Sequence, residues 1–348
     1  MNKIVVTSGY MGSGSSAATG LVSEIESFTA PNDSFEYVFL HCPNGVFDLE
    51  DKLLLNNNSN RSDEAIRSFY DTMRCLFHTS SKDYWVAGYK HNVSADFMKY
   101  VDTFLEEIGM IHTKGVWYYQ QRPTRYMLAQ IWINRIIRKC TMGKLAMVTP
   151  LRYRGMKLAF PEAGEFYQAA RNFINCVLDD LGYSQNNLIM DQFMLPHNLY
   201  RISNYFPENT VIIVVDRDPR DVFISNKYFW KKEPIPYPLD VKKFCEVYKR
   251  VRQNEIVCGD DRIIRIHFED LIYKYDEICN MLYWRLGISE DKHIEKKAKF
   301  NPEISINNTQ LYQMKDSFQE EANYIEHHLG RYCYDFPYVF GNSERKVF

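Results

Sequence analysis

The sequence predicts an α/β fold, a three-layer parallel sheet with a phosphate-loop-like nucleotide site and a large helical insertion. Short β-branched runs alternate with helical patterns, which is typical of a parallel sheet covered by helices on both faces. A Gly-rich stretch follows the first β-branched run. Residues from about 46 to 186, between the second and third runs, have mostly helical patterns. We expect residues 1–348 to form one domain that contains this insertion.

The N-terminal part has a β-α-β pattern. Residues 3–7 are a short β-branched run that ends in glycines, and residues 15–28 have the spacing of a helix. Residues 35–41 form a second apolar run, which Cys-Pro-Asn-Gly stops. We therefore expect two strands, at residues 3–7 and 35–41, with a helix between them.

The C-terminal half repeats this alternation. Strands are predicted at residues 188–190, 211–215 and 262–268, and helices at residues 196–205, 218–228 and 269–286. Because each strand is followed by a helix, these units extend the same parallel sheet.

The insertion is predicted to be helical, at residues 62–78, 94–108, 124–140 and 162–180. A parallel crossover needs only about a dozen residues, so this segment is more than a connector. Ligands of open α/β sheets bind beyond the carboxyl ends of the strands, and an insertion that leaves from a strand end can cover them. The alternative is an extra helical layer remote from the site.

Composition excludes several classes of protein. The 42 Lys and Arg residues against 44 Asp and Glu residues give a net charge of −2, which provides no global basic field for nucleic acid. No stretch reaches the roughly 20 apolar residues of a membrane span, and the N-terminus lacks the pattern of a signal peptide. We expect a cytoplasmic protein. The eight cysteines contain no C-x-x-C pair, so neither a zinc site nor a disulfide framework is predicted.

The first motif, Gly9-Tyr-Met-Gly-Ser-Gly-Ser-Ser16, follows the first strand and opens the first helix. It fits the phosphate-loop pattern except that Ser15 replaces the lysine. Glycines let backbone amides point inward, and a helix N-terminus adds positive potential, so we expect an anion site. A Gly/Ser-rich turn that binds nothing is the alternative. The missing lysine argues against an ATPase or a kinase.

The second motif comes after the strand at residues 211–215 and reads Asp216-Arg-Asp-Pro-Arg-Asp221, with Ser225 eight positions after Arg217. This spacing can bring a guanidinium and a hydroxyl to one anion. Two other interpretations stay open. Asp216 could be the magnesium carboxylate of a nucleoside triphosphatase, or the segment could be an ordinary helix start capped by Asp218.

Together the two motifs resemble those of sulfotransferases that use 3'-phosphoadenosine 5'-phosphosulfate (PAPS), of the bacterial carbohydrate type. The resemblance extends to His267-Phe-Glu-Asp-Leu271, to residues 301–309 and to Asp335-Phe-Pro337. It covers residues 1 to about 45 and about 185 to 337, and it leaves the insertion unmatched.

The resemblance implies a role for each matching residue. The 5'-phosphosulfate would be held by the loop residues Gly12, Ser13, Gly14, Ser15 and Ser16. Arg217 and Ser225 would bind the 3'-phosphate, Phe268 would lie near the adenine, and the turn at Asn308 would close over the nucleotide. No metal is expected.

One departure from the family concerns position 12. Many relatives carry Lys or Arg there, where this chain has Gly12. That cation steadies the charge on the bridging oxygen during transfer. A cation from elsewhere would have to replace it, and Lys90, Arg152 and Arg154 are the candidates.

An alcohol acceptor also needs a general base within hydrogen-bond reach. Asp191, at the predicted carboxyl end of the third strand, is the first candidate, and His41 and His197 follow. For each of them a satisfied polar residue or a helix cap is the alternative.

The insertion combines aromatic and basic side chains: Trp117, Tyr118, Tyr119, Arg122, Arg125, Tyr126, Trp132, Arg135, Arg138 and Lys139. Such a set fits an acidic saccharide, although an amphipathic packing helix has the same pattern. We therefore predict sulfuryl transfer from PAPS to a hydroxyl of a saccharide or another small acceptor. A kinase-like phosphotransferase and a non-catalytic nucleotide-binding module are the alternatives, and the oligomeric state stays open.

Overall fold

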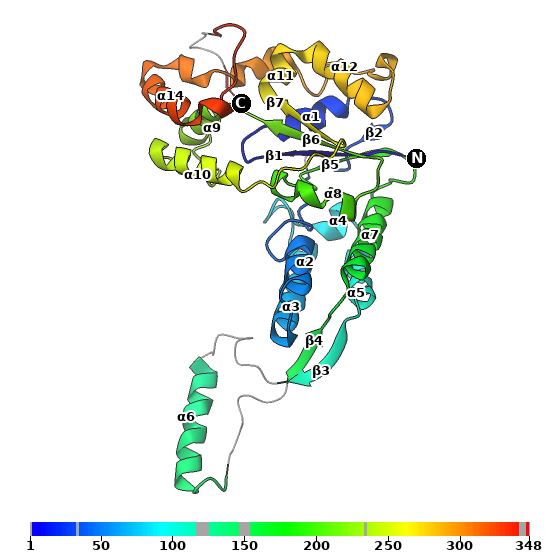
Figure 1. The fold of residues 1–348 in the computed structure, drawn as a ribbon, viewed down its shortest axis with the longest axis vertical. Coiled ribbons are helices and arrows are strands. Elements are labelled where there is room, and N and C mark those ends of the chain that lie inside the picture. The colour runs from blue at the N-terminus through cyan, green and yellow to red at the C-terminus, as the bar shows by residue number, and fades with distance from the viewer. Residues whose placement is uncertain are drawn as a thin grey trace.

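The structure, a computed structural model of the 348-residue chain, describes residues 2–32, 35–115, 125–145, 154–232, 235–340 and 346–347. Its centre is a parallel sheet of five strands (Figure 1). In spatial order the strands are β2 (Phe28–Thr29), β5 (Asn187–Asp191), β1 (Ile4–Gly9), β6 (Thr210–Asp216) and β7 (Ile263–His267). The predicted α/β fold class is confirmed.

Helices cover both faces of this sheet. One face carries α1 (Ser15–Val22), α11 (Phe268–Tyr273) and α12 (Tyr275–Leu286), which pack on strand residues such as Val5 and Ile213. On the other face Val6 and Ile212 share a core with α7 (Ala163–Asp180), α8 (Ile202–Tyr205) and the helices of the insertion. Strands buried on both faces contain continuous apolar runs, as β1 does at residues 4–6 and β6 does at residues 211–215.

A third group of helices lies beyond the carboxyl end of β6. It consists of α9 (Pro219–Ile224), the π-helix η2 (Ser225–Phe229), α10 (Val241–Gln253) and α14 (Asp316–Leu329). Phe223, Phe244 and Ile325 join these helices in a small core of their own. The remaining short elements of the described chain are η1 (Pro196–Arg201), η3 (Glu290–Lys292), α13 (Pro302–Ser305), η4 (Ile306–Asn308), η5 (Leu311–Met314) and η6 (Gly330–Tyr332).

The insertion contains the four predicted helices, as α3 (Ser59–His78), α5 (Phe97–Glu107), α6 (Arg125–Cys140) and α7. Two short helices, α2 (Val46–Leu54) and α4 (Tyr89–Asn92), precede α5. Phe69, Phe104 and Phe173 belong to the same buried cluster as Ile4 and Val6 of the sheet, so these helices share a core with the sheet.

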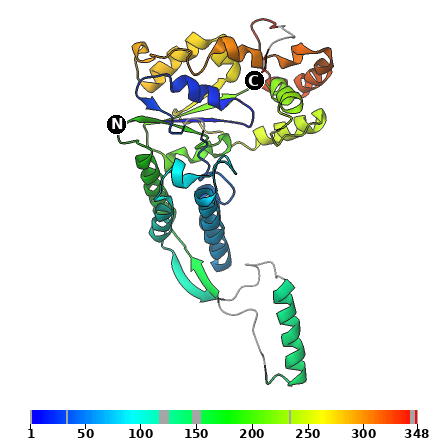
Figure 2. The same cartoon turned by 180° about the vertical axis from the view of Figure 1, so that it is seen from behind.

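The far part of the insertion is an arm. It leaves α5 through β3 (Ile111–Gly115) and returns to α7 through β4 (Arg154–Leu158), and the two strands pair antiparallel. Helix α6 lies at the end of this arm, apart from the other helices in both views (Figures 1 and 2).

The prediction of a strand at residues 35–41 is wrong. This segment is buried but irregular, because its polar backbone groups find partners outside a sheet ladder. The amide of Tyr37 donates to the carbonyl of Asp191 at 3.0 Å, and the amide of Val38 donates to the hydroxyl of Tyr89 at 2.9 Å. The edge of the sheet is β2 instead, and α1 ends at Val22, earlier than the predicted residue 28.

Candidate functional site

Two glycines shape the loop between β1 and α1. Gly12 has φ of 80° and Gly14 has φ of 82°, in the left-handed region that favours glycine. A Cβ on Gly12 would lie 2.9 Å from Ile235, and one on Gly14 would lie 2.9 Å from the Phe268 ring. The left-handed conformation strains any residue with a Cβ at these two positions, and Ile235 and the Phe268 ring would have to move to admit one. The loop therefore disfavours the cation that the sequence resemblance leads one to expect at position 12.

The loop leaves three successive amides open. Ser13 closes the turn, because its amide donates to the carbonyl of Tyr10 at 2.9 Å. The amides of Gly14, Ser15 and Ser16 make no hydrogen bond within the described part of the chain. The first amides of a helix lack partners inside the helix and attract anions together with the helix dipole. The geometry is therefore that of an anion site.

Arg217 lies beside this loop, at the carboxyl end of β6. Its guanidinium donates to the carbonyl of Gly12 at 3.1 Å and to the carbonyl of Asn308 at 2.7 Å. The guanidinium carbon is 5.0 Å from the centroid of the Phe268 ring. The structure thus brings together four residues that the sequence assigned to one nucleotide site.

Ser225 is the C-cap residue of α9, the helix that starts two residues after Arg217. Its side chain is fully buried, and among the described residues its hydroxyl has no hydrogen-bond partner. Buried hydroxyls are nearly always hydrogen-bonded. The Ser225 hydroxyl can therefore still donate to, or accept from, a group that binds beside it.

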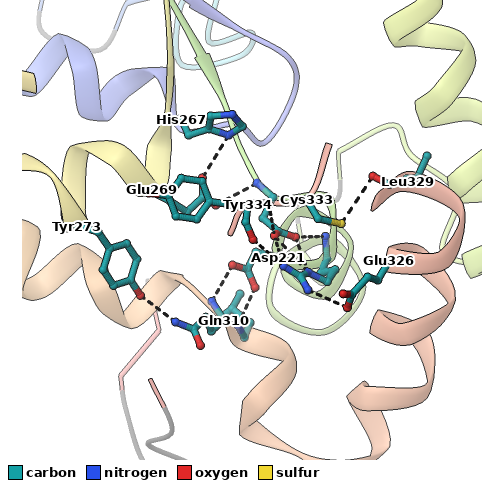
Figure 3. Close-up of polar contacts among 12 residues, drawn as sticks. Asp221, His267, Glu269, Tyr273, Gln310, Glu326, Leu329, Cys333 and Tyr334 are labelled. Carbon is teal, nitrogen blue, oxygen red and sulfur yellow. Dashed lines mark hydrogen bonds and ion pairs between the residues drawn. The ribbon is translucent and has the colours of Figure 1, made fainter. Parts of the chain in front are cut away.

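Two buried carboxylates, those of Asp221 and Glu269, connect segments around Arg217. The two oxygens of Asp221 accept from the amides of Gln310 and Leu311, each at 2.7 Å, and Figure 3 shows this carboxylate facing the Gln310 backbone. Glu269 accepts from the amide of Asp218 at 3.0 Å. Burial raises the pKa of both Asp221 and Glu269. Asp221 therefore fixes the segment that carries Asn308 against α9, and Glu269 joins α11 to the start of α9.

The remaining charges of the second motif are paired within the protein. Asp218 caps α9 by accepting from the amide of Arg220 at 2.8 Å, and it also pairs with the Arg220 guanidinium at 2.6 Å. Asp216 pairs with Arg252 at 2.5 Å and with Arg265 at 3.7 Å. The helix start with a local cap is therefore present, beside the cluster of Gly12, Arg217 and Phe268.

Asp191 ends β5, next to β1, and only 5% of its surface is exposed. Its carboxylate accepts from the hydroxyl of Thr7 at 3.2 Å. Burial, with the charge of Glu36 as a second cause, raises the pKa of Asp191 to about 7. The carboxyl group therefore titrates near neutrality.

Gln192 connects this strand end to the loop, a contact that the sequence did not reveal. It adopts φ of 54°, and its side-chain amide donates to the Ser15 hydroxyl at 2.8 Å. Its carbonyl lies 2.7 Å from Nε2 of His41. Burial lowers the pKa of His41 to about 4, so this imidazole is neutral at pH 7. The only signal for Gln192 was its position after Asp191.

His197 lies on another side of the loop, with its ring edge-on to Tyr10 at 5.3 Å between centroids. Burial, and then the charge of Arg252, lowers the pKa of His197. The Arg252 guanidinium carbon is 4.0 Å from the centroid of the Tyr10 ring. Sequence reasoning missed this cation because nothing in the spacing of α10 links it to the loop.

The cations proposed from the sequence are dispersed. Lys90 is exposed on α4, and Arg154 begins β4 in the arm. Arg152 lies outside the described residues, as do Trp117, Tyr118, Tyr119 and Arg122. The other aromatic and basic residues of the predicted acceptor set are all on α6, far from the sheet (Figure 1).

The described ranges contain neither a metal-ligand group nor a membrane-spanning helix. No group of three or more His, Cys, Asp or Glu side chains there is placed to hold a metal ion. None of the described helices combines the length and the apolar character needed to cross a membrane.

Comparisons with known proteins give one structural likeness. No protein-family model and no curated protein matches the chain. Among solved structures, the chain is similar to the sulfotransferase domain from the curacin biosynthetic pathway, with 14% sequence identity, 97% of this chain and 99% of that chain covered, and a TM-score of 0.39. At this level the likeness carries no argument about function.

Proposed function

We propose that the chain is a sulfotransferase that binds PAPS and moves its sulfuryl group to a hydroxyl of an acceptor. The observation that carries the proposal is the pairing of a lysine-free loop of open amides with the buried Arg217. A donor with anionic groups at both its 5' and 3' positions needs two such sites side by side.

The 5'-phosphosulfate is assigned to the loop. The amides of Gly14, Ser15 and Ser16 would donate to its oxygens, and the exposed Ser16 hydroxyl would assist. The Ser15 hydroxyl is already bonded to Gln192, which fixes the start of α1. Ser13 contributes by closing the turn.

The 3'-phosphate is assigned to Arg217 and Ser225. The Arg217 donors now serve the neutral carbonyls of Gly12 and Asn308. A phosphate carries full negative charge and attracts the guanidinium more strongly than a neutral carbonyl does, so it would take over these donors. It would also satisfy the vacant Ser225 hydroxyl. Phe268, packed on Gly14, would offer its ring to the adenine.

Transfer would form a bond between the acceptor oxygen and sulfur and break the bond from sulfur to the bridging oxygen of the phosphosulfate. In-line positioning and charge stabilisation provide most of the catalysis in such reactions. We assign the acceptor proton to Asp191, whose pKa of about 7 fits a general base. His41, with a pKa of about 4, is a weaker base, and His197 faces Tyr10.

The acceptor and the compartment rest on the sequence alone. We propose a saccharide hydroxyl and a cytoplasmic reaction, with the helices of the insertion that pack against the sheet, and not the distant α6, covering the acceptor. The kinase-like alternative has less support, because the loop has no lysine and Asp216 is held by Arg252 and Arg265.

Calorimetric titration of Arg217→Ala with adenosine 3',5'-bisphosphate tests the proposal. The affinity should fall about 10- to 150-fold, the equivalent of the 1.5–3 kcal/mol typical of hydrogen bonds to charged groups. Affinity for adenosine 5'-phosphate should fall much less. Arg250→Ala, an exposed arginine on α10, is the matched control. Equal losses for the two nucleotides would contradict a 3'-phosphate site at Arg217.

A further inference from the structure

The arm of the insertion differs in charge from the rest of the chain. Residues 108–161 contain ten Lys and Arg residues and no Asp or Glu. Because the whole chain has a net charge of −2, the remaining residues together carry −12. Such an asymmetry within one chain is typical of proteins that bind an anionic surface.

The outer element of this arm is α6, and its last turn contains Arg138 and Lys139. Arg125, Arg135, Arg138 and Lys139 are all exposed. Both views place the helix far from the sheet (Figures 1 and 2), and none of the three buried clusters of the described chain contains a residue of α6.

The same helix exposes large apolar side chains. Tyr126 is 72% exposed, Trp132 is 62% exposed and Ile136 is 58% exposed, and Leu128 and Ile133 are exposed as well. Trp132 and Ile136 are four residues apart, so they are neighbours on one side of the helix. Short helices without tertiary packing are marginal in water, and exposed apolar patches mark interaction sites.

We propose that α6 docks on a membrane surface that contains anionic lipids. Helices of this kind lie at the headgroup boundary, where apolar side chains enter the acyl region and basic ones pair with anionic lipids. The charge of −12 on the rest of the chain would be repelled by the same surface, so the arm alone would make contact. This inference is independent of the proposed nucleotide chemistry.

Two other occupants fit the observations less well. A second copy would bring another ten positive charges against the first ten, with no carboxylate in the arm to compensate. A nucleic acid would pair with the basic residues, but aliphatic side chains such as Ile133 and Ile136 would stay exposed to water.

Sedimentation of the full chain with vesicles tests the charge requirement. We expect binding to phosphatidylcholine vesicles that contain phosphatidylserine, little binding to pure phosphatidylcholine, and weaker binding at high salt. The variant R135E/R138E/K139E should lose at least about 100-fold in partitioning, because each basic residue near an anionic surface contributes about fivefold. The control K242E/K243E/K249E, with the same charge change on exposed lysines of α10, should lose little.

Quenching of tryptophan fluorescence by brominated lipids tests whether the exposed apolar side chains of α6 enter the acyl region of the membrane. Trp132→Phe should remove most of the quenching. Trp284→Phe is the control, because Trp284 is 76% exposed on α12, on the far side of the sheet from the arm. The Tm of all variants should match that of the unmodified chain, which shows that they fold.

Three results would overturn the inference. Equal binding to neutral and anionic vesicles would remove the role of charge. Retention of binding by the triple variant on α6, or of quenching by Trp132→Phe, would place the contact elsewhere. Binding of an RNA oligonucleotide, or self-association through α6 in sedimentation equilibrium, without vesicle binding would assign the arm to another partner.

Discussion

At the scale of single residues, the environment of Asp191 makes it the proposed base. The carboxylate is buried at the end of β5, has one hydroxyl donor in Thr7 and feels the charge of Glu36. These features favour its neutral form until the pH reaches about 7. A base with that pKa can accept a proton and release it again near neutral pH.

Asp191→Asn should therefore lower turnover by roughly 10²- to 10⁴-fold, the usual contribution of a general base. In the unmodified chain the proposed transfer rate should rise with pH through about 7 and then level off, because only the ionised carboxylate accepts a proton. The variant should lose this inflection and keep its affinity for adenosine 3',5'-bisphosphate. His41→Asn is the control; if it loses more activity than Asp191→Asn, the base lies at residue 41.

The same substitution has a predictable effect on stability. The pKa of Asp191 is about 7 in the folded chain and about 3.9 in an unfolded one. Between these values the folded state holds a proton that the unfolded state has lost, so stability falls as the pH rises from about 4 to 7. Asp191→Asn should raise Tm at pH 8 and leave it nearly unchanged at pH 4. A lower Tm at pH 8 would contradict the raised pKa.

Gly12 is a second residue whose identity follows from its surroundings. Gly12→Ala should lower Tm and weaken nucleotide binding, because a left-handed conformation costs a residue with a Cβ about 1–2 kcal/mol and Ile235 and Trp230 occupy the space. Gly259→Ala is the control, since a Cβ there meets nothing within 4 Å. Equal Tm values for the two variants would show that the loop tolerates side chains.

At the scale of elements, the strands with β-branched runs could be predicted and the aromatic run could not. Residues 211–215, for example, pair with β1 on one edge of the strand and with β7 on the other. Residues 35–41 are just as apolar, but Tyr89 and Asp191, both distant in the chain, satisfy their backbone groups. The β3–β4 pair was also missed. Its paired residues lie 39 or more positions apart in the chain, and apolar and polar residues do not alternate clearly in either strand. Local pattern contains no information about such partners.

The segment that carries Asn308 depends on one carboxylate. Asp221→Ala would leave the buried amides of Gln310 and Leu311 without acceptors, at about 1–3 kcal/mol for each. We expect a lower Tm, faster hydrogen exchange at these two amides and weaker binding of adenosine 3',5'-bisphosphate. Glu320→Ala, an exposed carboxylate on α14, should change none of these. Unchanged exchange at Gln310 and Leu311 would contradict the anchoring role.

At the scale of the whole molecule, the site is assembled from segments that are far apart in the chain. Gly12, Arg217, Phe268 and Asn308 could be assigned to one site from the sequence, because the motifs that contain them resemble those of a known family. Arg252 and Gln192 have no motif, and only the folded chain places them beside the loop. The position of α6 likewise follows from the antiparallel pairing of β3 and β4.

The central claim is that the loop and Arg217 hold a nucleotide with a 3'-phosphate and need no metal ion. Competition between adenosine 3',5'-bisphosphate and ATP for the unmodified chain, with Mg²⁺ and then with excess EDTA, tests it most directly. We expect at least about tenfold tighter binding of the bisphosphate, a difference of about 1.4 kcal/mol, and the same Kd in Mg²⁺ and in EDTA. Tighter binding of ATP that disappears in EDTA would contradict it and would make Asp216 a metal ligand.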